Sequence, residues 1–210
     1  MNDSATIHPT AIIEDGVHIG PDTCVWDNVH IREGASIGRG CIVGEKSYIA
    51  YGVRVGDLCK INASVYICAG VSIQDGVMIS AHTVFTNDPL PRATDPALVR
   101  LRSRDPDAHT KSTTVHRGVT IGANCTIGPG LRLGEWCMVG MGSVVTRDVP
   151  SHALVVGNPA KIAGAVCACD KLSRWDAALS LLREMQLLGA LRDRALEPDA
   201  APATGLIATA

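Results

Sequence analysis

The sequence predicts an all-β fold, a parallel β-helix built from six-residue repeats. Three observations predict it: a large aliphatic or Phe residue at every sixth position, a small or apolar residue four positions further on, and glycines restricted to two phases of the repeat. A period of six matches neither the 3.6-residue period of an amphipathic helix nor the alternation of a half-buried strand. It fits short strands joined by regular corners and stacked so that equivalent side chains form ladders.

The two ladders extend over most of the chain. The first consists of Ile7, Ile13, Ile19, Val25, Ile31, Ile37, Val43, Ile49, Val55, Ile61, Ile67, Ile73, Ile79 and Phe85, and it resumes with Val115, Ile121, Ile127, Leu133, Val139 and Val145. The second is made of small or apolar residues such as Ala35, Cys41, Ser47 and Val53. With three repeats per turn, these positions predict about six to seven turns of coil.

The glycines mark the corners of this coil. Within the repeats, each glycine follows the large aliphatic residue by one position, as Gly122 and Gly140 do, or by three, as Gly142 does. Glycine adopts the positive φ angles that tight corners need. Corner geometry alone explains these glycines without a ligand.

Composition narrows the class of protein further. Aromatic residues make up 3% of the chain and apolar residues 46%, which suggests a narrow interior filled by Ile, Val and Ala. Cys41, Cys59, Cys125 and Cys137 fall on the second ladder and are expected to be small core residues instead of disulfides. The net charge of −2 argues against nucleic acid as a partner. No apolar run approaches the ~18 residues that span a bilayer, and the polar start does not resemble a signal peptide, so no membrane contact and a cytoplasmic location are expected.

The repeat is interrupted once and then ends. Residues 88–114 contain four prolines and five basic residues, and such a long irregular excursion is either a solvated loop or a functional arm. Its basic residues favour the arm. We therefore expect a β-helix domain over residues 1–165 with this loop inserted, a helical extension over 166–197 and a disordered tail over 198–210.

Several segments resemble a known family, the left-handed β-helix N-acyltransferases, over about residues 5–165. The segments are His8-Pro9-Thr10-Ala11-Ile12, Trp26-x-x-Val29-His30-Ile31, Phe85-Thr86-Asn87 with Pro91-Arg92-Ala93, Val144-Val145-Thr146-Arg147-Asp148-Val149-Pro150, and Leu154 to Lys161. The Phe-Thr-Asn and Pro-Arg-Ala motifs within one loop resemble those of one branch of this family. That branch acetylates the 3-amino group of nucleotide-linked amino sugars. The resemblance implies left-handed winding, a homotrimer, and acetyl-CoA and acceptor bound in grooves between adjacent coils.

The resemblance also implies roles for particular residues. Asn87 matches the loop asparagine that approaches the thioester sulfur or the reacting amine, and Arg92 matches the arginine of the same loop. The rung Asn62-Ala63-Ser64 departs from these relatives, which carry an amide-rich segment there, so some contacts to the acceptor or acyl group are expected to differ. Arg92, Asn62 and Ser64 are the candidate substrate-binding residues.

The implied reaction is attack of a neutral amine on a thioester carbonyl. It needs positioning, oxyanion stabilisation and removal of a proton. Small residues at Gly122, Ala123, Gly140 and Gly142 would leave room for the pantetheine arm of coenzyme A, and Lys161 would meet a phosphate at its nucleotide end. His82 at a corner and His109 in the loop are the candidate general bases, because imidazole titrates near neutral pH; the amine can also arrive unprotonated and need no dedicated base.

Other functions remain open for such a coil. O-acetylation of a sugar or another small hydroxyl acceptor is the alternative within acyltransferases, and it demands a stronger base. A scaffolding β-helix would have no long basic loop. A zinc-dependent carbonic anhydrase needs three histidines around one ion, and their spacing here does not provide them, so no metal site is expected.

Overall fold

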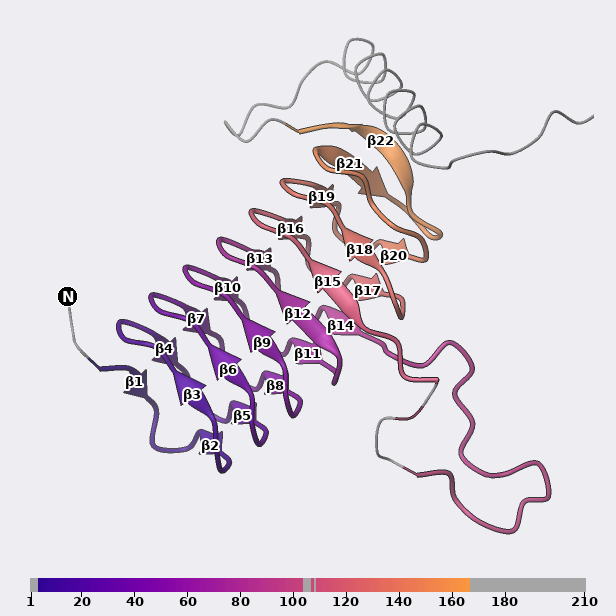
Figure 1. Cartoon of the computed structure of the whole chain (residues 1–210). Coiled ribbons are helices and arrows are strands. Elements are labelled where there is room, and N and C mark those ends of the chain that lie inside the picture. Colours follow the sequence, from indigo (N-terminus) through magenta and orange to yellow (C-terminus); the bar gives the residue numbers. More distant parts are fainter. Residues whose placement is uncertain (1–3, 104–106, 108, 167–210) are drawn as a thin grey trace, which may run out of the picture.

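The computed structural model describes residues 4–103, 107 and 109–166, and they form a parallel β-solenoid (Figure 1). Sheet A contains β1 (Thr6–Ile7), β4 (Cys24–Val25), β7 (Ile42–Val43), β10 (Lys60–Ile61), β13 (Met78–Ile79), β16 (Thr120–Ile121), β19 (Met138–Val139), β21 (Ala153–Val156) and β22 (Lys161–Ala165). Sheet B contains β2 (Ile12–Ile13), β5 (His30–Ile31), β8 (Tyr48–Ile49), β11 (Tyr66–Ile67), β14 (Val84–Phe85), β17 (Thr126–Ile127) and β20 (Val144–Val145). Sheet C contains β3 (His18–Ile19), β6 (Ser36–Ile37), β9 (Arg54–Val55), β12 (Val71–Ile73), β15 (Thr113–Val115) and β18 (Arg132–Leu133). The predicted all-β parallel β-helix is confirmed.

The strand register confirms three repeats per turn. Neighbouring strands pair in parallel with partners three repeats apart, as Thr6 with Cys24 and His30 with Tyr48. We call one strand from each sheet a rung, so that β1 to β3 form rung 1 and β13 to β15 form rung 5. A residue therefore lies directly over the equivalent residue three repeats earlier, except across the loop, where Ile79 pairs with Ile121.

The first ladder fills the interior. From Val25 to Val145 every one of its members is buried, with Ile31, Ile49 and Ile67 fully enclosed. Ile7 is 43% exposed because rung 1 has no rung beneath it. At the other end β21 pairs in parallel with β19 and then folds back on β22 in an antiparallel hairpin, which covers the last rung.

The second ladder closes the corners. Its four polar members Thr23, Ser47, Thr83 and Ser143 are buried, and each hydroxyl donates a hydrogen bond to a backbone carbonyl. Its cysteines Cys41, Cys59, Cys125 and Cys137 are buried free thiols, as expected from their position in the repeat. Buried polar groups are therefore paired, which a narrow core requires.

Three columns of corners run along the solenoid. The A–B edge connects sheet A to sheet B, the B–C edge connects sheet B to sheet C, and the C–A edge begins the next rung. At the A–B edge one residue on each of rungs 2 to 7 has positive φ: Asn28, Lys46, Ser64, His82, Asn124 and Gly142.

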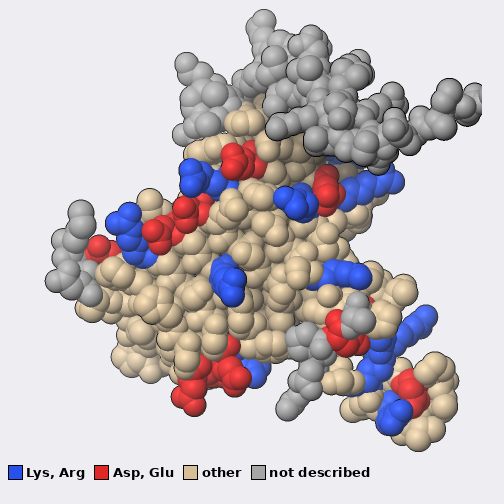
Figure 2. Space-filling view, viewed as in Figure 1, with Lys and Arg blue, Asp and Glu red and all other residues tan. Residues whose placement is uncertain are grey.

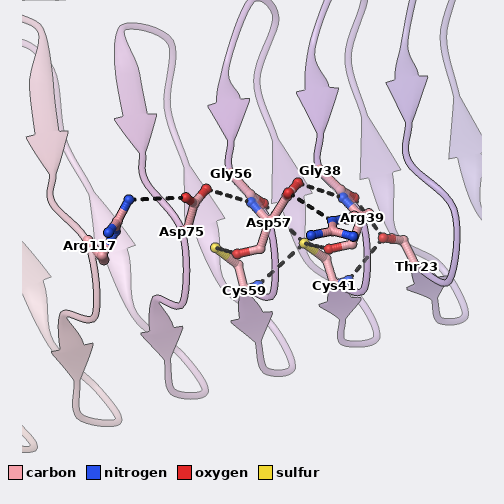
Figure 3. A network of polar contacts seen from close by, with 9 residues as sticks. All are labelled: Thr23, Gly38, Arg39, Cys41, Gly56, Asp57, Cys59, Asp75 and Arg117. Atoms are coloured by element: carbon pink, nitrogen blue, oxygen red, sulfur yellow. Dashed lines mark hydrogen bonds and ion pairs between the residues drawn. The ribbon is translucent and has the colours of Figure 1, made fainter. Parts of the chain in front are cut away.

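The C–A edge shows how the corners are tied together (Figure 3). The backbone N–H and Nε of Arg39 donate to Asp57, and the backbone N–H of Asp57 donates to Asp75. A Cβ atom at Gly38 or Gly56 would collide with Asp57 or Asp75, respectively. These glycines are therefore needed because the carboxylate of the next rung occupies their side-chain space.

The loop leaves the solenoid at the B–C edge of rung 5 and projects from it (Figure 1). Its predicted range of 88–114 is too long at the end, because Thr113 already pairs with Val71 in β15. The Thr113 side chain is buried, and its hydroxyl accepts hydrogen bonds from the backbone N–H groups of Gly130 and Leu131. The predicted helical extension beyond Val166 and the predicted tail lie outside the described residues.

The surface is of mixed charge. In the view of Figure 2, Lys and Arg side chains lie beside Asp and Glu side chains over the solenoid and on the loop, with no broad basic patch. In the described part of the chain no helix has the length and apolar character to cross a membrane.

Candidate functional site

The A–B edge brings together most of the residues that the sequence pointed to. Asn62 and Ser64 lie at this edge on rung 4, His82 on rung 5, Gly122 and Ala123 on rung 6, and Gly140 and Gly142 on rung 7. Backbone hydrogen bonds join successive corners: His82 N–H to Ala63 O at 3.1 Å, Asn124 N–H to Ala81 O at 2.9 Å, and Gly142 N–H to Ala123 O at 2.8 Å. These candidates therefore form one continuous column.

The three glycines of this column differ in what surrounds them. A Cβ atom at Gly122 would lie 2.5 Å from the backbone nitrogen of Met141, and one at Gly140 would lie 2.6 Å from the Val156 side chain. Packing against the next layer explains these two without a ligand. Gly142 has a φ of 71° and open space where a side chain would be, so it is the glycine with room beside it for a bound molecule.

Lys161 lies close to the top of the same column. It pairs with Val156 in the terminal hairpin, and the Val156 side chain covers Gly140. Lys161 is exposed. The sequence interpretation that groups Lys161 with the glycine corners is thus consistent in space.

Asn87 lies on the other side of sheet B, at the B–C edge of rung 5. Its Nδ2 donates to the backbone carbonyl of Ala69 at 3.1 Å, and the backbone carbonyl of Asn87 accepts from the backbone N–H of Lys111 at 2.7 Å. The first bond holds the side-chain amide against rung 4, and the second joins the two ends of the loop, so the amide is fixed at the base of the loop.

The other two loop candidates are Arg92 and His109. Arg92 lines a separate hollow of about 810 Å³ within the loop, together with Asp95 and Arg102. His109 is exposed, and its backbone N–H donates to Asp107. Within one chain, Asn87, Arg92 and His109 therefore do not meet the A–B column that carries His82.

Asn87 lines a surface hollow of about 590 Å³ beside sheet B, which we call the B–C hollow. Its lining comprises Arg32, Glu33, Tyr48, Ala50, Tyr51, Tyr66, Cys68, Ala69 and Asn87. Burial raises the pKa of the Cys68 thiol to about 11, so this sulfur is protonated at neutral pH and is no nucleophile.

A network of charged side chains closes the N-terminal end of this hollow. Glu14 accepts from Arg32 Nε at 2.7 Å and contacts His30 Nε2 at 2.7 Å, and Arg32 Nη1 donates to the Tyr48 hydroxyl at 2.9 Å. The Arg32 guanidinium, helped by His30, lowers the pKa of the Glu14 carboxyl from 4.5 to about 2. The arginine is therefore held by a carboxylate that stays ionised at all ordinary pH values.

Aromatic rings form the wall of the hollow. Tyr48 and Tyr66 stack with centroids 5.1 Å apart and planes within 6°, and His30 meets Tyr48 edge-on at 5.4 Å. His30, Tyr48 and Tyr66 are paired partners on successive rungs, so the stack follows from the register of sheet B.

This network was missed by the sequence interpretation. From the sequence, no binding role is assigned to Tyr48, Tyr66 or His30. A signal was present, because Glu14 and Arg32 carry opposite charges three repeats apart and the three rings share one column.

Within the described residues no group of three or more His, Cys, Asp or Glu side chains is arranged to hold a metal ion.

Comparison with known proteins places these features in context. A family model described as bacterial transferase hexapeptide (six repeats) matches residues 16–51 and 112–147, and one described as hexapeptide repeat of succinyl-transferase matches residues 34–69. The dTDP-3-amino-3,6-dideoxy-alpha-D-galactopyranose 3-N-acetyltransferase of Aneurinibacillus thermoaerophilus is 58% identical over 57 residues, which is 27% of this chain and 30% of that relative. The match thus spans less than a third of the relative's length.

Solved structures share the fold. A hexapeptide-repeat acetyltransferase from Vibrio cholerae O1 biovar eltor, complexed with acetyl coenzyme A, is 27% identical with a TM-score of 0.51, covering 63% of this chain and 71% of that one. A maltose O-acetyltransferase from Clostridium difficile 630 is 24% identical with a TM-score of 0.51, covering 66% and 70%. The chain therefore carries hexapeptide repeats of the transferase type on both sides of the loop, and those repeats form its solenoid.

Proposed function

We propose that this protein transfers an acetyl group from acetyl-CoA to the 3-amino group of a nucleotide-linked amino sugar. The observation that carries the proposal is the position of Asn87. Its amide is fixed at the base of the loop and lines the B–C hollow, which can hold an acceptor beside it. The local similarity to a dTDP-amino-sugar N-acetyltransferase supports the choice of acceptor, and the similarity to a structure bound to acetyl-CoA supports the donor.

The reaction balances without a metal or a covalent enzyme intermediate. The amine nitrogen forms a bond to the thioester carbonyl carbon, the carbon–sulfur bond breaks, and one amine proton passes to the departing thiolate. The products are an amide and free coenzyme A. Fixed donors near the carbonyl oxygen stabilise the negative charge that develops on it, and the Asn87 amide is our candidate for positioning the reacting groups.

The proposed assembly is a homotrimer with the active site between chains. Asn87 and the A–B column lie at the two sides of sheet B, so one chain alone keeps them apart. A neighbouring chain whose A–B column faces the loop would bring Gly142, Lys161 and His82 to Asn87. Closed cyclic assemblies present such complementary surfaces repeatedly. We also place the reaction in the cytoplasm, and the free cysteines of the described residues suit a reducing compartment.

The test is to incubate purified full-length protein with acetyl-CoA and a panel of dTDP-, UDP- and GDP-linked amino sugars while following thiol release. We expect release with at least one 3-amino sugar and none with the matching 3-hydroxy sugar. Light scattering gives the assembly; a monomer that still turns over would contradict the site between chains.

Two variants separate amine from hydroxyl acceptors. Asn87→Ala is expected to lower kcat/KM by about a hundredfold, the usual cost of losing one fixed donor at a developing charge. His82→Asn keeps the positive φ that the corner needs, as Asn28 and Asn124 already have it, but removes the imidazole. Asn28→Gly serves as the control for loss of an amide elsewhere.

If His82→Asn abolishes turnover while Asn87→Ala has little effect, a general base is essential, and the O-acetyltransferase alternative is correct instead.

A further inference from the structure

The shape of the B–C hollow follows from a change in residue size along two columns of the B–C edge. The first column reads Glu14, Arg32, Ala50, Cys68 and Thr86, and the second reads Asp15, Glu33, Tyr51, Ala69 and Asn87, in order of rungs 1 to 5. Large or charged side chains on rungs 1 and 2 thus give way to small ones at Ala50, Cys68 and Ala69. The small residues leave the space, and Tyr48 and Tyr66 wall it along sheet B.

The hollow is elongated along the solenoid axis. Arg32 on rung 2 and Asn87 on rung 5 both line it, and three rungs separate them. With neighbouring strands about 4.8 Å apart, its two ends are about 14 Å from each other. An extended molecule with a different chemical group at each end fits this shape better than a compact one.

Arg32 lies at the end of the hollow opposite Asn87, and hydrogen bonds fix its side chain there. Its Nε donates to Glu14 and one Nη1 hydrogen donates to Tyr48, while the guanidinium carries five N–H donors in a rigid fork. Among the described residues these two contacts fix the plane and leave further donors on Nη1 and Nη2. The guanidinium carbon also lies 6.0 Å from the Tyr51 ring centroid. Fixed guanidinium groups of this kind suit phosphate oxygens.

We propose that the B–C hollow binds the acceptor lengthwise, with the amino sugar at Asn87 and the diphosphate of its nucleotide at Arg32. This inference rests on the proposed function and adds the subsite that recognises the nucleotide. Between the two ends, the sugar ring passes over Cys68 and Ala69 beside the 44% exposed face of Tyr66.

Glu33 makes the subsite selective. Glu33 lines the hollow beside Arg32 on the same rung, so this end carries one anionic and one cationic residue. A free polyanion would be repelled by Glu33. A nucleoside diphosphate offers phosphate oxygens to Arg32 and hydroxyl or ring N–H donors to the carboxylate, so we expect dTDP to bind more tightly than inorganic pyrophosphate.

Isothermal titration calorimetry on the full chain tests the subsite without requiring turnover. The probes are dTDP, UDP, GDP, inorganic pyrophosphate and coenzyme A. Arg32→Gln should weaken the best nucleoside diphosphate by about 10- to 100-fold, the range for hydrogen bonds to a charged group. Coenzyme A binding should stay unchanged.

The matched control is Arg39→Gln. Arg39 also pairs with a carboxylate of an adjacent rung, but at the C–A edge, outside the hollow (Figure 3). It should leave every probe unaffected. Thermal unfolding of both variants shows whether each still folds, and Tyr66→Leu, which removes the aromatic wall but no charge, gives a second reduction in dTDP affinity.

Two results overturn the inference. If Arg32→Gln weakens coenzyme A and not dTDP, the hollow belongs to the nucleotide end of the cofactor. If the protein acetylates a nucleotide amino sugar but Arg32→Gln leaves the KM for that sugar unchanged, the proposed function stands and the subsite is wrong. If dTDP binds through Arg32 but no amine is acetylated, the proposed function fails and the nucleotide subsite stands.

Discussion

Two ion pairs of the same construction have different surroundings in this solenoid. Arg32 pairs with Glu14 at the B–C edge, and Arg39 pairs with Asp57 at the C–A edge; in each case the partners lie on adjacent rungs, three repeats apart. Arg32 and Glu14 are 36% and 28% exposed in their side chains, whereas Arg39 and Asp57 are 67% and 43% exposed. The stacking of rungs produces both pairs.

The difference lies in what the next rungs provide. Beyond Arg32 the corner residues Ala50 and Cys68 are small and leave a hollow, while beyond Asp57 the next carboxylate, Asp75, accepts a backbone N–H and continues the ladder. A repeat thus supplies charged pairs at regular intervals. A pair becomes a binding group only where the repeat loses side-chain volume beside it.

The largest effect we predict is a loss of stability on changing a buried residue of the first ladder. Ile67→Ala should lower the free energy of unfolding by about 2–5 kcal/mol, because the side chain is fully buried and its removal leaves a cavity. Its outward neighbour is the control: Tyr66→Leu should cost far less stability while reducing dTDP affinity. Chemical denaturation of both variants measures the difference. Equal losses would mean that the Tyr66 wall is structural.

A smaller effect separates charge from geometry at the two arginines. Arg32→Lys keeps the positive charge but cannot hold Glu14, Tyr48 and a diphosphate in one plane, so dTDP should bind about tenfold more weakly. Arg39→Lys should not change dTDP affinity. Calorimetric titration of both variants with dTDP measures the two affinities. Unchanged dTDP affinity in Arg32→Lys would show that Arg32 acts only as a point charge.

The smallest predicted effect is a dependence of stability on pH. The pKa of Glu14 falls from 4.5 to about 2 on folding, so this carboxylate contributes stability that is fully present above pH 4.5 and is lost as the pH falls through 2. The Tm difference between the unmodified protein and Glu14→Gln should therefore be largest at neutral pH and disappear near pH 2. The pKa of Asp57 is also lowered, by the backbone and side chain of Arg39, so Asp57→Asn should show the same sign. A difference that grows on acidification would contradict the assigned pair.

Much of the fold could be predicted because one physical requirement repeats. A large aliphatic residue must point inward once per strand, and this requirement fixes Ile31, Ile49 and Ile67 in register without any long-range information. Ile7 shows where the pattern stops being informative, since the same residue type is exposed on the end rung. The path of the loop could not be predicted, because no repeat constrains it. Its end is defined by the pairing of Thr113 with Val71.

The candidate site was predictable only in part. The A–B column could be predicted, because His82 and Gly142 share one phase of the repeat and Gly122 and Gly140 share another. The hollow was not found, because it depends on Arg32, Ala50 and Cys68 together, and their outward positions show a pattern only when every third repeat is compared. In the proposed trimer, Asn87 would meet the A–B column through contacts between chains, and no spacing within the sequence encodes such contacts.

A crystal structure of the protein with dTDP and coenzyme A tests the central claim most directly. The account predicts the diphosphate within hydrogen-bonding distance of Arg32, and the coenzyme A sulfur beside Asn87 at the other end of the same hollow. A dTDP molecule bound elsewhere, or a sulfur that lies away from Asn87, would contradict it.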